Sequence, residues 1–101
     1  MRVRLSIQAL EDIRGIAAFI SDHNPERAAS FADELLDACE EIDERPAAYP
    51  SRLQWGRGVR VRYYGHYAII FDTDSALVSI LRVVHAARDL DALMDNDPGN
   101  Q

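Results

Sequence analysis

Four side chains in the second half of the chain could act on a phosphate group: Arg62, Tyr64, Arg82 and His85. Cleavage of RNA by its own 2′-hydroxyl needs a base for the attacking oxygen, an acid for the leaving oxygen and cations beside the phosphate. Histidine, tyrosine and arginine can fill these roles. His85 directly follows an apolar segment, where it could equally be a structural histidine that binds the turn. The four residues are therefore candidates for catalysis, with a structural role as the alternative for His85.

Other catalytic and ligand-binding patterns are missing from the sequence. His23, His66 and His85 are not spaced as metal ligands, and Cys39 is the only cysteine, so we expect no metal, no cofactor and no intramolecular disulfide. Cys39 falls on the apolar face of a predicted helix and is interpreted as a small core residue. No glycine-rich phosphate loop, nucleophile elbow or catalytic carboxylate pair can be identified.

Charge is distributed in three blocks along the chain. Residues 1–44 carry four arginines and eleven acidic residues, residues 45–71 carry five arginines and no acidic residue, and residues 72–101 carry two arginines and six aspartates. All eleven basic residues are arginines, and the net charge is −6. This balance argues against direct DNA binding by the chain alone. The basic middle block instead favours contacts with carboxylates, which the planar guanidinium can bind at two points.

Hydrophobic periodicity predicts the elements that must position these residues. Apolar residues at spacings of three and four indicate helices over residues 9–22 and 25–44, and the short link at Asn24-Pro25 makes them an antiparallel hairpin. Alternating or continuous apolar segments indicate strands over residues 2–6, 59–64, 67–72 and 77–84. Gly65-His66 is predicted to be a two-residue hairpin loop, and residues 88–94 a short helix.

The predicted fold class is α+β. An N-terminal strand and an antiparallel helical hairpin pack on a small, mainly antiparallel sheet in the order β-α-α-β-β-β, followed by a short C-terminal helix. We expect one domain over residues 1–94 and a disordered tail over residues 95–101, which have nothing apolar to bury. No apolar run could span a membrane and no secretory signal is visible, so a cytoplasmic protein is expected.

One face of the predicted sheet points away from the helices and has the features of a binding surface. Strand alternation is interpreted as placing arginines and apolar side chains together there, a combination typical of protein-binding sites. These residues are Arg60, Arg62, Arg82, Ile70, Val78, Ile80 and Val84, with Tyr64 as a further contact.

Two further segments leave a structural and a binding interpretation open. Trp55, in a turn-rich loop over residues 49–58, could anchor that loop to the core or present an exposed aromatic to a partner. Arg88-Asp89 could be a local ion pair or helix cap, or a contact with a target.

The order of these segments resembles a known family. The opening segment 5–13 (LSIQALEDI), the strand pair 61–64 (VRYY) and 67–71 (YAIIF), and the ending 80–90 (ILRVVHAARDL) look like the ParE branch of the RelE/ParE toxin superfamily. Members of this branch are the toxin halves of bacterial type II toxin-antitoxin pairs. The resemblance covers about residues 2–94.

The resemblance implies a toxin that inhibits growth by acting on DNA gyrase and is neutralised by a ParD-like antitoxin in a hetero-oligomer. It favours a binding protein over an enzyme. The antitoxin would contact Arg60, Arg62, Tyr64, Ile70, Val78, Ile80 and Arg82, and the target would contact Trp55, Arg57, His85, Arg88 and Asp89.

Two alternatives stay open beside this interpretation. One is a ribosome-dependent mRNA endonuclease of the RelE type, which would use Arg62, Tyr64, Arg82 and His85. Against it, RelE-like nucleases have a lysine-rich, strongly basic surface, whereas this chain has no lysine and is acidic overall. The other is a non-toxic binding module of the same fold.

Overall fold

A computed structural model describes residues 2–74, 76–90 and 93 of the chain. The predicted α+β fold is confirmed, in the order β1 (Arg2–Leu5), α1 (Ile7–Ser21), α2 (Pro25–Glu41), β2 (Val59–Tyr64), β3 (Tyr67–Asp74) and β4 (Leu77–His85). A helical turn, Ala86–Leu90, follows β4 and begins two residues before the predicted terminal helix. The predicted tail over residues 95–101 lies outside the described residues.

The four strands form one mixed sheet in the order β1-β4-β3-β2. β1 pairs parallel with β4, and the other two pairings are antiparallel hairpin pairings. Ile70 lies opposite Arg82 while Phe71 lies opposite Ile80, so β4 has one extra residue, Leu81, at this point. Such a bulge reverses which face of the sheet the following side chains point to.

Each helix of the hairpin begins directly after a capping residue, and α1 begins two residues before the predicted start at residue 9. The Ser6 hydroxyl accepts a hydrogen bond from the Ala9 amide at 3.0 Å, and the Asn24 side chain accepts one from the Arg27 amide at 3.1 Å. Each cap satisfies an amide of a first helical turn that has no partner within the helix. Pro25 occupies the first turn of α2, where its missing N–H costs nothing.

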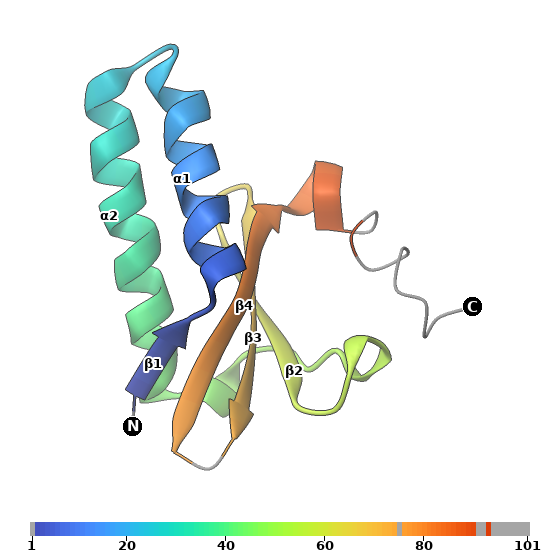
Figure 1. Cartoon of the computed structure of the whole chain (residues 1–101). Coiled ribbons are helices and arrows are strands. Elements are labelled where there is room, and N and C mark those ends of the chain that lie inside the picture. Colours follow the sequence, from blue (N-terminus) through green and yellow to red (C-terminus); the bar gives the residue numbers. More distant parts are fainter. Residues whose placement is uncertain (1, 75, 91–92, 94–101) are drawn as a thin grey trace.

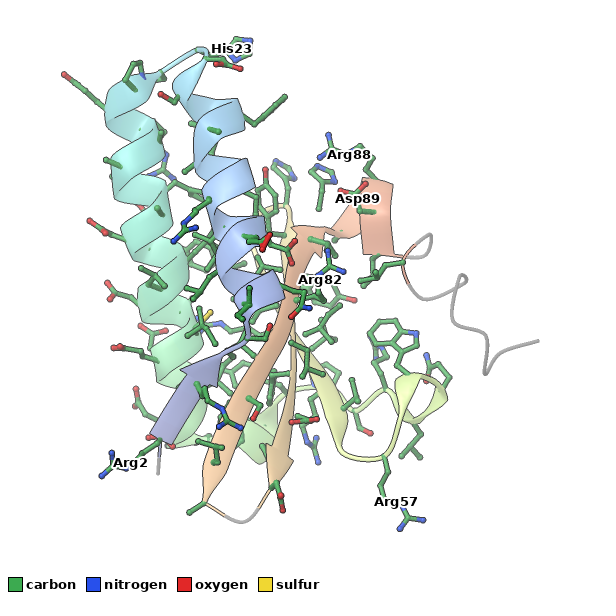
Figure 2. The ribbon with its side chains drawn as sticks, viewed as in Figure 1. Arg2, His23, Arg57, Arg82, Arg88 and Asp89 are labelled. Atoms are coloured by element: carbon green, nitrogen blue, oxygen red, sulfur yellow. The ribbon has the colours of Figure 1, made fainter. Side chains whose placement is uncertain are left out.

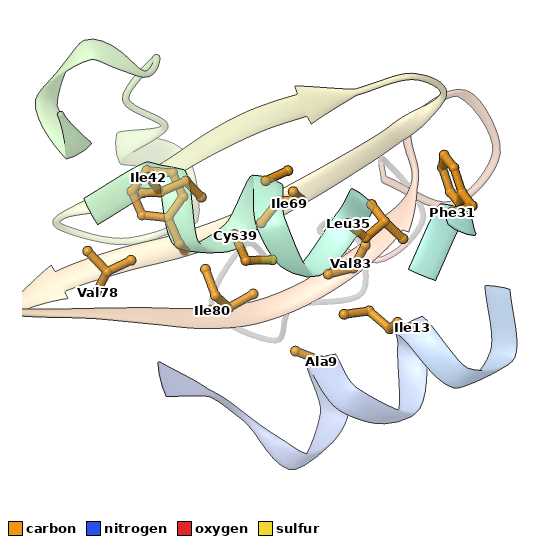
Figure 3. Packing of buried hydrophobic residues seen from close by; sticks show 12 residues of the cluster. Ala9, Ile13, Phe31, Leu35, Cys39, Ile42, Ile69, Val78, Ile80 and Val83 are labelled. Carbon is orange, nitrogen blue, oxygen red and sulfur yellow. The ribbon is translucent and has the colours of Figure 1, made fainter. Parts of the chain in front are cut away.

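The main hydrophobic core lies between the helical hairpin and one face of the sheet (Figure 1). Its twelve fully or largely buried residues interdigitate from both layers (Figure 3). They are Ala9, Ile13, Phe31, Leu35, Ala38, Cys39, Ile42, Ile69, Phe71, Val78, Ile80 and Val83. Cys39 is completely buried, as predicted, and burial raises the pKa of its thiol to about 12.

A second, smaller cluster covers the opposite face of the sheet. It consists of Val59, Val61, Ala68, Ile70, Val84 and Leu90, with Trp55, Leu81, Ala86 and Leu93 packed against it. The loop before β2 and the segment after β4 therefore cover much of the face that the sequence predicts to be open. Trp55 is partly buried and packs against this cluster, so it anchors the loop while part of the ring stays exposed.

The predicted apolar residues of that second face are correct for Ile70 and Val84 and wrong for Val78 and Ile80. Val78 and Ile80 are fully buried under the helices, whereas Ile70 and Val84 lie on the other side. Simple alternation puts residues 78, 80 and 84 on one face, and the bulge at Leu81 breaks it. Among the described residues, neither helix is both long and apolar enough to cross a lipid bilayer.

Candidate functional site

The arginines of β2 point toward the helical layer rather than toward the second face of the sheet. Arg62 donates to the Ala38 carbonyl at 2.7 Å and forms an ion pair with Glu41 at 3.0 Å. Arg60 donates to the Tyr49 carbonyl at 2.7 Å. Both residues alternate with Val59 and Val61, which face the second cluster, so the pleat of β2 decides their direction. Arg60 and Arg62 therefore do not share a face with Ile70, contrary to the prediction.

Tyr64 continues this row and contacts the acidic side of α2. Its hydroxyl donates to Glu34 at 2.9 Å, and Arg27 donates to the same carboxylate at 3.2 Å. The Arg27 hydrogen bond, followed by the Tyr64 hydrogen bond, lowers the pKa of Glu34, and the bond to Glu34 raises the pKa of Tyr64. Part of the acidic face of α2 is thus engaged in contacts within the chain, at Glu34 and Glu41.

Arg82 lies apart from the β2 arginines and holds α1 against β4. Its guanidinium donates to the Asp12 carboxylate at 2.7 and 3.0 Å, and the Val83 amide donates to the same group at 2.9 Å. The hydrogen bond to Asp12 raises the pKa of Arg82. β1 pairs with β4 only as far as Ile80, so Asp12 satisfies a strand amide beyond the end of that pairing.

A groove of about 420 Å³ opens between α1 and the segment that follows β4. This volume falls within the range of ligand-binding clefts. Its lining combines apolar side chains, including Phe19, whose exposed fraction is 58%, with charged ones. The polar lining residues are Glu11, Asp12, Tyr67, Arg82, His85, Arg88 and Asp89. The structure therefore gathers three of the five predicted target contacts, His85, Arg88 and Asp89, in one groove.

The side chains at the end of β4 are arranged around His85. Its Nδ1 atom accepts a hydrogen bond from the Arg88 amide at 3.2 Å, and its ring stacks on that of His66 with a centroid distance of 6.0 Å. Tyr67 contacts the same ring edge-on at 5.5 Å. Arg88 and Asp89 form an exposed ion pair at 3.4 Å. His85 therefore binds the turn, as its structural interpretation expects, and it also lines the groove.

The other two predicted target contacts lie elsewhere. Arg57 projects from the loop before β2, at the end of the molecule opposite Arg88 and Asp89 (Figure 2). Trp55 packs on the second cluster in the same loop, with the Arg52 guanidinium 5.8 Å from its ring centre. The five residues therefore do not form one continuous site.

The four candidate catalytic residues are also divided. Arg62 and Tyr64 contact α2, whereas Arg82 and His85 line the groove beside α1. The residues that organise both places, Glu34, Asp12 and His66, were not predicted as site residues. Asp12 and Glu34 fall on the polar faces of their helices, and His66 is an exposed loop residue, so no spacing in the sequence distinguishes them.

Solved structures that share this fold include two from toxin-antitoxin systems. The chromosomal ParDE toxin-antitoxin system from P. aeruginosa matches with a TM-score of 0.72 and 17% identity, covering 84% of this chain and 95% of that chain. The toxin-antitoxin complex RelBE2 from Mycobacterium tuberculosis matches with a TM-score of 0.58 and 21% identity, covering 83% and 95%. At such identities the likeness defines the fold, which is that of chains found in toxin-antitoxin structures.

The sequence itself gives the family. The model of the ParE toxin of the type II toxin-antitoxin system parDE matches residues 3–90, which include every described strand and helix apart from the first residue of β1. The chain therefore belongs to the ParE toxin family. A search of curated proteins finds no match.

Proposed function

We propose that the chain is the toxin of a type II toxin-antitoxin pair that stops growth by acting on DNA gyrase in the cytoplasm and is neutralised by a ParD-like antitoxin. The observation that carries this proposal is the family match across residues 3–90, which spans the whole described fold. The toxin acts by binding its target rather than by catalysis. In keeping with this, the acidic chain carries no lysine with which to coat a nucleic acid.

The proposed antitoxin surface is reduced to β2. This strand is an edge strand of the sheet. Every second residue along it, Arg60, Arg62 and Tyr64, is partly exposed. A carboxylate of the antitoxin would compete with Glu41 for Arg62, because the Glu41 side chain is 55% exposed and therefore holds its partner weakly. Of the remaining predicted contacts, Ile70, Val78 and Ile80 are buried, and Arg82 lies apart from β2, in the groove beside α1.

The proposed target surface is the groove beside α1. The ion pair between Arg88 and Asp89 is long and exposed, with side-chain exposures of 62% and 47%, so either group can exchange its partner at little cost. Phe19 at the rim adds an exposed aromatic ring, a residue type that often anchors protein interfaces. Trp55 and Arg57 would contact the target only through a second, separate patch.

An mRNA endonuclease of the RelE type remains the alternative, favoured by the likeness to the RelBE2 structure. That likeness is weaker than the one to the ParDE structure. The division of Arg62 and Tyr64 from Arg82 and His85 supports it poorly, because acid–base catalysis requires its groups within hydrogen-bonding reach of one substrate.

The decisive experiment is a plasmid supercoiling and cleavage assay with purified gyrase, ATP and this chain, with and without a ParD-like antitoxin. We expect loss of supercoiling or accumulation of cleaved plasmid, reversed by the antitoxin. Arg88→Glu should weaken the effect on gyrase at least tenfold, whereas Arg14→Glu, an exposed change on α1, should not. A folded, growth-inhibiting chain without effect on gyrase would refute the proposed target, and cleavage of ribosome-bound mRNA would then establish the alternative.

The antitoxin surface has its own test. Arg60→Glu and Arg62→Glu together should weaken antitoxin binding by more than tenfold, measured by titration calorimetry, while Arg14→Glu again serves as the control. Unchanged affinity of a folded double variant would exclude β2 from the interface.

A further inference from the structure

The segment after β4 is held against the sheet by two histidines. The Ala86 amide donates to the His66 carbonyl at 2.8 Å, and the Arg88 amide donates to His85 Nδ1 at 3.2 Å. The His66 and His85 rings lie nearly parallel, with an interplanar angle of 12°. These contacts fix the turn Ala86–Leu90, which in Figure 1 leaves the end of β4 on the side away from α2.

The turn ends at a buried residue, Leu90. Leu90 is only 7% exposed and belongs to the second cluster, where it packs with Ile70 and Val84. Releasing the turn would therefore return the Leu90 side chain to water and uncover neighbouring apolar surface on the sheet. A change at His85 is thus linked to the exposure of that part of the second face which the turn covers.

We propose that the stacked pair of His66 and His85 is a pH-sensitive latch, which holds the turn Ala86–Leu90 against the sheet at neutral pH and releases it under mildly acidic conditions. The bond from the Arg88 amide needs a lone pair on His85 Nδ1, which exists only in the neutral imidazole. Protonation turns His85 Nδ1 into an N–H donor that faces the N–H donor of Arg88, so the hydrogen bond is lost. It also places two cationic rings 6.0 Å apart.

The sign of the effect follows from this requirement. Imidazole is the side chain that changes charge between pH 5 and 8. Because the closed turn uses the neutral form, the stabilisation is present at the upper end of that range and is lost as the pH falls.

The charged and titratable groups around His85 either contact its ring or line the same groove. They are His66 in the hairpin loop, Tyr67 on β3, Arg82 on β4, Glu11 and Asp12 on α1, and Arg88 and Asp89 in the turn. Asp12 is paired with Arg82 and Asp89 with Arg88, so these four largely cancel.

Amide hydrogen exchange of the full chain, followed by NMR, tests the latch directly. After correction for intrinsic exchange, the protection of the Ala86 and Arg88 amides should fall about tenfold between pH 7.5 and 5.5, which corresponds to the loss of one net hydrogen bond. The amide of Ile69, in the centre of the sheet, should keep its protection and report that the fold is intact.

A matched variant separates the latch from general effects of pH. His85→Asn retains an acceptor at a similar reach but cannot be protonated, so its Ala86 and Arg88 amides should keep their protection at pH 5.5. His66→Asn removes the second cation together with the stacked ring and should reduce the response of the Arg88 amide to pH.

Equal loss of protection in the wild type and in His85→Asn, or no loss in either, would overturn the proposal. If His85→Asn does not fold, the proposal is tested by a pH titration of the wild type followed by NMR. The chemical shift of the Arg88 amide must then change with the same midpoint pH as the His85 ring, and a different midpoint would refute the latch.

Discussion

Asp12→Ala is the substitution whose cost the structure predicts most directly. The Asp12 carboxylate accepts two hydrogen bonds from Arg82, at 2.7 and 3.0 Å, and one from the Val83 amide at 2.9 Å. Truncation leaves a guanidinium without its partner and a strand amide without its acceptor, in a place where the Asp12 side chain is only 16% exposed. The contact ties α1 to β4, so its loss should destabilise the whole fold.

The free energy of unfolding lost in Asp12→Ala should lie between the values for two reference cases. Hydrogen bonds to charged groups contribute about 1.5–3 kcal/mol, whereas exposed ion pairs contribute about 0.2–1 kcal/mol. The Arg82 side chain is 35% exposed and can regain water, so we expect Asp12→Ala to lower the free energy of unfolding by about 2 kcal/mol. For a domain of this size that corresponds to a fall in melting temperature of roughly 8 °C or more.

Urea denaturation followed by circular dichroism measures this cost. Glu11→Ala, the neighbouring exposed residue, is the matched control and should stay within about 0.5 kcal/mol of the wild type. A double-mutant cycle with Arg82→Ala should give a coupling energy of about 1 kcal/mol between the two side chains. If Asp12→Ala costs no more than Glu11→Ala, or if the coupling is zero, then the contact does not hold α1 on the sheet.

Three further predictions concern burial and pH. Burial raises the pKa of the Cys39 thiol to about 12, so a thiol reagent at pH 8 should label the protein only in denaturant; rapid labelling of the native state would contradict this. Ile80→Ala should cost about 2–5 kcal/mol in urea denaturation, because Ile80 is fully buried, whereas Leu53→Ala, at a 73% exposed side chain, should be nearly neutral; equal costs would remove Ile80 from the core. The pKa of Glu34 is lowered from its ordinary value of 4.5, so its contribution to stability is present above that pH and is lost as the pH falls below it; Glu34→Gln should flatten the acid limb of the stability curve, and an unchanged limb would exclude this linkage.

The course of the chain could be predicted because it depends on local signals. Ser6 and Asn24 are residue types that favour the N-cap position and cap the two helices, and Gly65 adopts a positive φ in the predicted hairpin loop. Each of these features depends on residues only a few positions apart, so the order of residue types along the chain is enough to predict it. The family resemblance, confirmed over residues 3–90, likewise rests on the order of such segments.

The arrangement of the candidate site could not be predicted, because it depends on contacts between distant segments. Alternation predicts which strand residues share a face only while the ladder is regular, and the bulge at Leu81 inverts the outcome beyond it. The same alternation does not say which face of the sheet the helices cover. In the structure they cover the face that carries Arg62 and Tyr64, so these two side chains contact α2.

Sequence alone therefore determined the elements, the fold class and the family of this protein, since propensity, capping and periodicity are properties of neighbouring residues. Tertiary structure decided the partners of each charged side chain. Asp12 meets Arg82 across 70 residues and Glu34 meets Tyr64 across 30, and such pairs form only where packing of the helices on the sheet brings them within hydrogen-bonding distance.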